Sequence, residues 1–364
     1  MSKKPTIKVL PNALLPLCRF VVGKRLRSLA LLTVVLIVIG SPQVLRAQTN
    51  LYNVPPGTTN TVSGFITGPG GLELIGGGVL DVTGTTNDYA GATSITNGTL
   101  RIAALANAGT ASSIGTNATV NLVGANATNA VLDYTGGNVA ADRNFVASDG
   151  GGTINMASSS TVMTLTGSSS GSGTLIVGEG TMLLSNTATA NAFAPASIQV
   201  DSGATLQLAA SEQIGNTTGL ILNGGTFRLG TATTGFSETL GTLTLTSNST
   251  IDLGAWATGV RQLTFADSSA ISWTGTLTIT NWQGVAFQSS DVAEIIFGTG
   301  GLTSTQLGQV YWANQNISGG TLLGGTGELV PIPEPRVYAA VVGLLFAVGW
   351  RERKRILGLF QRSA

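Results

Sequence analysis

One short motif recurs along the chain: a glycine, then threonine or a close substitute, then apolar residues two positions apart. It occurs as NGTLRI (97–102), SGTLIV (172–177), EGTMLL (179–184), SGATLQL (202–208), GGTFRL (224–229), LGTLTL (240–245), TGTLTI (274–279) and GGTLLG (319–324). Because side chains alternate between the two faces of a β-strand, Leu243 and Leu245 point one way, and Thr244 and Thr246 point the other. Each copy therefore predicts a glycine corner followed by a short strand with one apolar face.

Repetition of this unit favours an all-β fold in which successive turns stack as a parallel β-helix, or β-solenoid. Glycine fills 50 of the 364 positions, about twice its usual share of roughly 7%, and it suits corners where the chain turns sharply. The steps from Gly203 to Gly225 to Gly241 are close to the length of one solenoid turn, although the spacing is irregular elsewhere. A β-sandwich or a set of hairpin modules is the alternative.

Charge is distributed very unevenly along the chain. Lys and Arg gather before residue 47 and from residue 336 onward, whereas the body between Gln48 and Val330 holds four Arg, no Lys and fifteen Asp and Glu, leaving it eleven charges negative. Such a surface repels nucleic acid and anionic lipid, which argues against nucleic acid as a partner. The chain has no His, and its single Cys is Cys18. Neither a disulfide nor a zinc site is therefore expected in the body.

The first 47 residues have the order of parts of a secretory signal peptide. A basic stretch (1–28) precedes an apolar run (29–40), and the following SPQVLRAQ predicts cleavage after Ala47. The alternative, an N-terminal membrane anchor, needs about 20 apolar residues, whereas 29–39 supply eleven. The sequence thus predicts export by Sec-type machinery.

The last segment, 331–364, joins three features: the triplet Pro333, Glu334 and Pro335, an apolar run (337–350), and the basic cluster Arg351, Arg353, Lys354 and Arg355. The two prolines hold the chain extended, so that Glu334 is accessible to a protease. The fourteen apolar residues would span about 21 Å as a helix, and flanking arginines can snorkel to lengthen that reach. The pattern predicts a single transmembrane helix with the basic cluster on the cytoplasmic side.

This order of parts resembles the PEP-CTERM sorting signal of Gram-negative bacteria, on Pro333, Glu334 and Pro335, the apolar run and the basic cluster. The resemblance implies recognition, and cleavage near the triplet, by a membrane-embedded exosortase. It covers only about the last 35 residues. A simple C-terminal anchor is the alternative interpretation.

A second resemblance covers 70–109, GGLELIGGGVLDVTGTTNDYAGATSITNGTLRIAALANAG. This segment looks like the autotransporter-associated β-strand repeat, with an Asn-x-Tyr-x-Gly turn followed by a Gly-Thr-Leu strand. The matching residues are Asn87, Tyr89, Gly91, Gly98, Thr99 and Leu100. The resemblance implies a parallel β-helix passenger exposed on the cell surface.

The region 255–330 differs from the repeats of 48–254 because it begins the part of the chain that holds every tryptophan. One hypothesis makes four of them a sugar-stacking face: Trp256, Trp273, Trp282 and Trp312. The other, which we favour, makes the region a bulky β cap over the open end of the solenoid. One short helix is predicted within 302–312, with Thr303 or Ser304 as its cap.

The sequence offers no convincing catalytic constellation. Residues 167–171 fit Gly-x-Ser-x-Gly, but without a histidine base they read as a Ser/Gly-rich loop. Asp133, Asp142, Asp149 and Asp201 are isolated candidates for glycosidase carboxylates, and no sequence pair singles any out. No catalytic, cofactor-binding or metal-binding residue is predicted.

The sequence therefore predicts an exported structural or adhesive β-solenoid, without enzymatic activity. It would pass through the inner membrane, be processed by an exosortase and reach the outer surface or extracellular matrix, where extracellular polysaccharide is the candidate partner. A secreted glycan-binding or glycan-cleaving β-helix enzyme is the alternative function.

Overall fold

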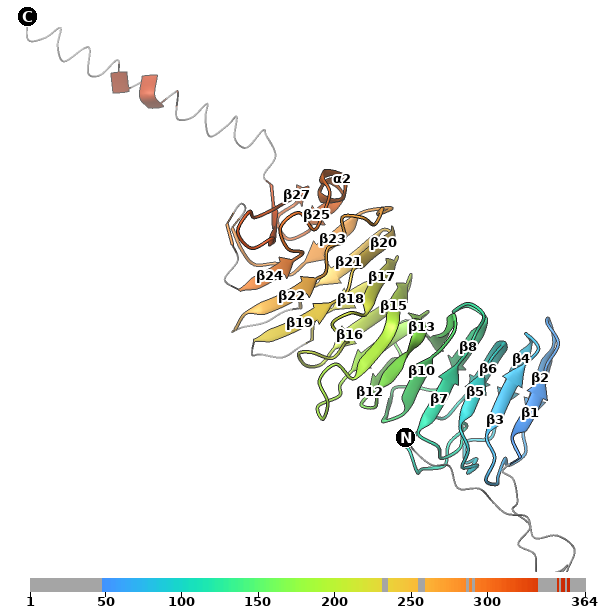
Figure 1. Cartoon of the computed structure of the whole chain (residues 1–364). Coiled ribbons are helices and arrows are strands. Elements are labelled where there is room, and N and C mark those ends of the chain that lie inside the picture. The colour runs from blue at the N-terminus through green and yellow to red at the C-terminus, as the bar shows by residue number, and fades with distance from the viewer. Residues whose placement is uncertain are drawn as a thin grey trace, which may run out of the picture. The chain divides into compact units, whose positions relative to one another are not determined.

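The computed structural model describes residues 48–230, 235–254, 259–285, 288–289 and 292–332, and a few residues of the tail between 346 and 353. Between 48 and 332 nearly all regular structure is β-strand, and neighbouring strands run parallel with about one circuit of chain between them (Figure 1). The predicted all-β parallel solenoid is confirmed. The sandwich and hairpin alternatives are wrong, because described strands pair antiparallel only at the C-terminal end of the stack.

The strands form three ribbons, in each of which a strand pairs with those one turn before and after it. Ribbon A contains β1 (Asn50–Asn53), β3 (Leu72–Ile75), β5 (Thr93–Ile95), β7 (Thr119–Leu122), β10 (Asn144–Ala147), the first parts of β13 (Ser169–Val177) and β15 (Phe193–Asp201) and, after an interruption, β19 (Phe236–Leu240), β22 (Arg261–Phe265) and β24 (Ala293–Ile296). Ribbon B contains β2 (Thr59–Val62), β4 (Val79–Val82), β6 (Gly98–Ile102), β8 (Ala130–Tyr134), β11 (Gly151–Met156), the second parts of β13 and β15, β17 (Gly219–Asn223) and β20 (Leu243–Ser247). Ribbon C contains β9 (Val139–Ala141), β12 (Val162–Leu165), β14 (Gly180–Leu184), β16 (Ala204–Leu208), β18 (Thr226–Arg228), β21 (Ser249–Asp252), β23 (Leu277–Thr280) and β25 (Val310–Trp312).

The parallel stacking ends in a short irregular region. Helix α2 (Ser304–Gly308) begins at the predicted cap, where the Thr303 side chain accepts from the backbone N–H of Gln306 while the Gln306 side chain accepts from the backbone of Thr303. This reciprocal pair is a capping box. Beyond β25 the chain reverses into β26 (Ile317–Ser318), and β27 (Gly320–Leu322) pairs antiparallel with β28 (Leu329–Pro331).

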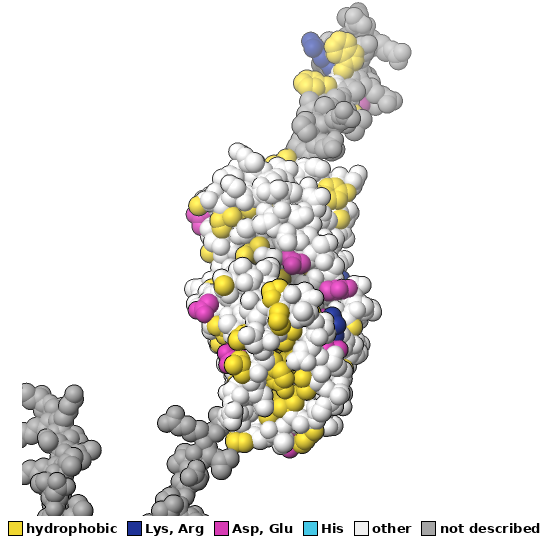
Figure 2. Space-filling view, turned by 90° about the vertical axis from the view of Figure 1, so that its right-hand side faces the viewer, with side chains coloured by type: hydrophobic (Ala, Val, Ile, Leu, Met, Phe, Trp, Pro, Cys, Tyr) yellow, Lys and Arg dark blue, Asp and Glu magenta, His cyan; other side chains and the backbone are white. Residues whose placement is uncertain are grey.

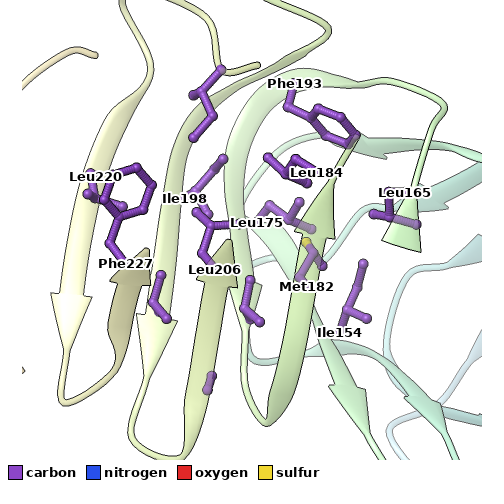
Figure 3. Packing of buried hydrophobic residues seen from close by; sticks show 14 of the residues in the cluster. Ile154, Leu165, Leu175, Met182, Leu184, Phe193, Ile198, Leu206, Leu220 and Phe227 are labelled. Atoms are coloured by element: carbon purple, nitrogen blue, oxygen red, sulfur yellow. The ribbon is translucent and has the colours of Figure 1, made fainter. Parts of the chain in front are cut away.

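The core is a set of aliphatic ladders inside the ribbons. In ribbon B the strand register places Leu222 between Val200 and Leu245, and in ribbon C it places Phe227 between Leu206 and Ile251. These side chains are buried, and side chains from the facing ribbons converge between the strands (Figure 3). Each apolar residue thus packs on equivalents one turn away, which is how a chain with short strands buries a continuous core.

The Gly-x-Ser-x-Gly segment corrects one expectation. Residues 169–171 are not a loop but the start of β13, where Ser169 pairs with Phe145 on one side and Phe193 on the other. Ser169 is buried. The Ser/Gly-rich composition misled the prediction, because small side chains are also what a tightly stacked strand needs.

The repeat at 70–109 forms part of this stack. Asn87 is fully buried, and its Oδ1 accepts from the N–H of Ile66 (2.9 Å) while its Nδ2 donates to the carbonyl of Ser113 (3.0 Å). One side chain therefore ties a turn to the turns before and after it. The Tyr89 hydroxyl lies 2.7 Å from Thr93 Oγ1, and burial raises the pKa of Tyr89. The Asn-x-Tyr-x-Gly turn is a corner of the solenoid.

Candidate functional site

The outward face of ribbon C carries a column of threonines. Thr181, Thr205, Thr226, Thr250 and Thr278 are in register on five successive strands, and all are half-buried. Parallel strands lie about 4.8 Å apart, so the hydroxyls repeat at that interval. The column presents uncharged hydrogen-bonding groups along the side of the stack.

The outward face of ribbon B mixes charges and amides. Arg101 lies in register between Asp81 and Asp133 and makes an ion pair with Asp133 at 3.0 Å. Farther along, Asp201 accepts from the side-chain amides of Gln199 (2.7 Å) and Asn223 (2.9 Å). Asp133 and Asp201 on this face are thus engaged by neighbours within the protein.

The four arginines of the body leave little positive charge for a partner. Arg143 and Arg261 are fully buried, and the half-exposed Arg101 and Arg228 pair with aspartates. Figure 2 shows one face of the molecule, on which acidic side chains are dispersed, basic ones are rare and most of the surface is neither. Such a distribution of charge is expected to repel polyanions, and the exclusion of nucleic acid as a partner stays a prediction.

The four sequence candidates for catalytic carboxylates have separate structural roles. Asp133 and Asp201 have the partners just described, and Asp142 Oδ1 accepts from the N–H of Ala108 at 2.6 Å. Asp149 occupies a turn with φ of 54°. None of these contacts brings two of the four carboxylates together. Across the described part of the chain, no three His, Cys, Asp or Glu side chains gather as metal ligands.

A different carboxyl, Glu238 of β19, is fully buried where ribbon A is interrupted. Its two oxygens accept from the backbone N–H groups of Gln213 and Ile214, each at 2.8 Å. The Gln213 side chain in turn bonds both backbone groups of Asn186 in the turn before. These side chains supply the hydrogen bonds that strand pairing provides elsewhere. Burial raises the pKa of Glu238 to about 8, although the two N–H groups act to lower it.

The raised pKa predicts a pH-dependent stability. An unfolded chain would lose the Glu238 proton near pH 4.5 and the folded chain near pH 8. The contribution of this group is therefore fully present below pH 4.5 and is lost as pH rises to about 8, a change on the order of several kcal/mol. Urea unfolding at steps between pH 5 and 8 should show that the free energy of unfolding falls as pH rises. Glu238→Gln should reduce this fall. Glu73→Gln, on the outward face of β3, should leave it unchanged. Equal slopes in all three proteins would contradict the assignment.

The three described tryptophans of the region 255–330 do not form a stacking face. Trp273, Trp282 and Trp312 are buried, with 7%, 3% and 1% of their surfaces exposed. Trp282 and Trp312 pack edge to face with ring centroids 4.9 Å apart. The sugar-stacking hypothesis is wrong for these three, because rings this deep cannot meet a ligand. Trp256 lies outside the described residues.

Most of the predicted sorting and cleavage residues also lie outside the described residues: Ala47, Pro333, Glu334, Pro335, Arg351, Lys354 and Arg355. Arg353 is described, and it is exposed and helical, as are Phe346 and residues 348–350. No helix within the described ranges is long and apolar enough to cross a membrane. The run 337–350 falls mostly beyond those ranges, so its role stays a prediction.

Two structurally important residues were missed by sequence reasoning, Arg143 and Glu238. The Arg143 guanidinium donates to the carbonyls of Ala106, Asn107, Thr110, Gly115 and Asn117 and to the hydroxyl of Ser112. It thereby holds the loop 106–117, which joins two strands of the solenoid. The only sequence signal for Arg143 was the scarcity of positive charge. Where the body has four arginines and no lysine, each arginine is a candidate for a buried structural role.

The chain matches no protein-family model and no solved structure. It is 36% identical over 141 residues, 36% of its length, to the "Adhesin BmaC autotransporter" of Brucella suis biovar 1 (strain 1330). The chain covers 4% of that much longer relative. The similarity and the stacked turns together agree with autotransporter-like β-repeats.

Proposed function

We propose that this protein is an exported, non-enzymatic surface protein of adhesive or structural type, whose solenoid works through its outward faces. The observation that carries the proposal is the parallel stack with uncharged polar columns, joined to the similarity with a segment of an adhesin. A repetitive face offers many equivalent weak contacts, which suits attachment through avidity.

The proposal includes the route to the surface. A Sec-type signal would be removed after Ala47, and an exosortase would recognise Pro333, Glu334 and Pro335 while the apolar run and Arg351, Arg353, Lys354 and Arg355 hold the chain in the inner membrane. Release would deliver the solenoid to the outer surface or to a matrix of extracellular polysaccharide. The support for this route is the sequence pattern at the two ends.

The route is tested by the intact mass and location of the full chain in its native host. We expect Glu334→Gln, or deletion of 351–355, to yield a heavier protein retained in the membrane fraction. The control Glu73→Gln, a carboxylate on the solenoid, should leave mass and location as in the wild type. Identical processing of all variants would contradict the sorting proposal, and release of products from a polysaccharide panel would contradict the non-enzymatic one.

A further inference from the structure

A hollow of about 400 Å³ lies on the outward side of ribbon B. It is lined by β15, β17, β20 and the corners beside them: Ala196, Ser197, Asn216, Thr217, Gly219 and Ile221, with Gly241, Thr242, Thr244 and Ala266. Its volume falls within the range of small-molecule sites, about 300–1,000 Å³. It crosses three successive turns of the solenoid.

The absence of a side chain at Gly219 helps to open the hollow. The fold itself does not require glycine at this position. A Cβ at Gly219 would meet only ordinary contacts, Ser197 Cβ at 3.6 Å and the Thr242 carbonyl at 3.8 Å, and the backbone there is not left-handed. The in-register neighbour in the previous turn, Ser197, carries a side chain. Glycine inside a strand weakens it and often marks a place where a ligand approaches the backbone. By contrast, a Cβ at Gly241 would clash with the Thr217 carbonyl at 2.6 Å.

The chemistry around Gly219 is polar and uncharged, and Asn216 and Thr217 are exposed. Among the described residues, the side chains of Asn216, Thr217, Thr242 and Thr244 surround the hollow and have no hydrogen-bond partner within the protein. The hollow also has apolar lining, from Ile221 and two alanines. No charged residue lines it. Hydroxyls and an amide together with apolar side chains match a ligand that has both hydroxyl groups and C–H faces and no charge.

We propose that this hollow binds one ring of a neutral glycan, with the C–H face of the sugar on Ile221 and its hydroxyls bonded to the surrounding side chains. The inference rests on the proposed surface function and names the ligand class for one place on it. Acidic sugars are disfavoured, because the body carries eleven excess negative charges and the hollow offers no cation.

The test uses the full chain, purified in a detergent without a sugar group, and saturation-transfer NMR with methyl glycosides. The probes are glucose, galactose, mannose, N-acetylglucosamine and, as the acidic comparison, glucuronic acid. We expect at least one neutral glycoside to bind with a Kd near the millimolar range, and Gly219→Thr to weaken it at least tenfold. The variant should keep the wild-type unfolding midpoint or exceed it, since Thr suits a strand.

Gly137→Thr is the matched control, because a Cβ at this exposed glycine meets nothing within 4 Å and its backbone is not left-handed. It should bind like the wild type. Absence of binding by every neutral glycoside, or undiminished binding by a folded Gly219→Thr, would overturn the inference. If either of these binding results is obtained while export and surface location are normal, the proposed function still stands. A failure of export would count against the proposed function and not against the glycan site.

Discussion

Gly91→Ala should destabilise the solenoid by about 3 kcal/mol or more, because the added methyl group has no space to enter. A Cβ at position 91 would lie 2.3 Å from the nitrogen and 2.7 Å from the Cα of Gly71, and 2.5 Å from the carbonyl carbon of Gly70. All three atoms are backbone of the preceding turn, so relief requires the two turns to separate. The Gly91 N–H, which donates to the Gly70 carbonyl at 2.9 Å, would then lose its partner.

The control is Gly137→Ala, whose methyl group would meet no atom within 4 Å. Neither glycine has a left-handed backbone, so the pair differs in space and not in conformational preference. Because alanine restricts the unfolded chain, the control should be neutral or slightly stabilising. Chemical denaturation followed by far-UV circular dichroism compares the midpoints. A Gly91→Ala midpoint equal to that of the control would show that the turns are not packed as described.

Arg143→Met should cost about 3–5 kcal/mol. The change keeps an unbranched apolar chain but removes the guanidinium, which donates to five backbone carbonyls of one loop. The site is fully buried, so water cannot replace those donors without opening the loop. The midpoint of thermal or urea unfolding should be clearly lower than in the wild type. The amide hydrogen exchange rate should increase first in residues 104–117.

Arg101→Met serves as its control. Arg101 is 42% exposed and paired with Asp133, and exposed ion pairs contribute about 0–1 kcal/mol. Both substitutions remove one positive charge, so an effect of net charge would appear equally in both. Similar unfolding midpoints for the two variants would therefore refute the loop-holding role of Arg143.

Local patterns predicted the strands well but not their places around the stack. The alternation in LGTLTL placed Leu243 and Leu245 inside and Thr244 outside, as observed. The same motif, however, begins strands in both ribbon B and ribbon C. Any glycine corner followed by a strand whose apolar side chains point into the core fits the motif. For this reason the step from Gly225 to Gly241 is not a turn of the solenoid: Gly225 precedes β18 of ribbon C and Gly241 precedes β20 of ribbon B.

Functional surfaces were harder to predict than the fold. The cap at Thr303 follows from residues three positions apart, whereas Glu238 and Arg143 reach partners that are 24 or more residues away. Such contacts depend on the register between turns. The hollow at Gly219 depends on it as well, because its lining comes from three turns and its glycine resembles every other glycine in the sequence.

The uniform pairing within each ribbon also bears on how such a chain can evolve in length. Duplication of a complete circuit would supply every ribbon with a new strand whose partners already exist above and below. Duplication of part of a circuit would instead move later strands to a different side and turn their aliphatic residues toward water. Growth by whole circuits, with extra residues confined to corners, is thus the path that this architecture leaves open.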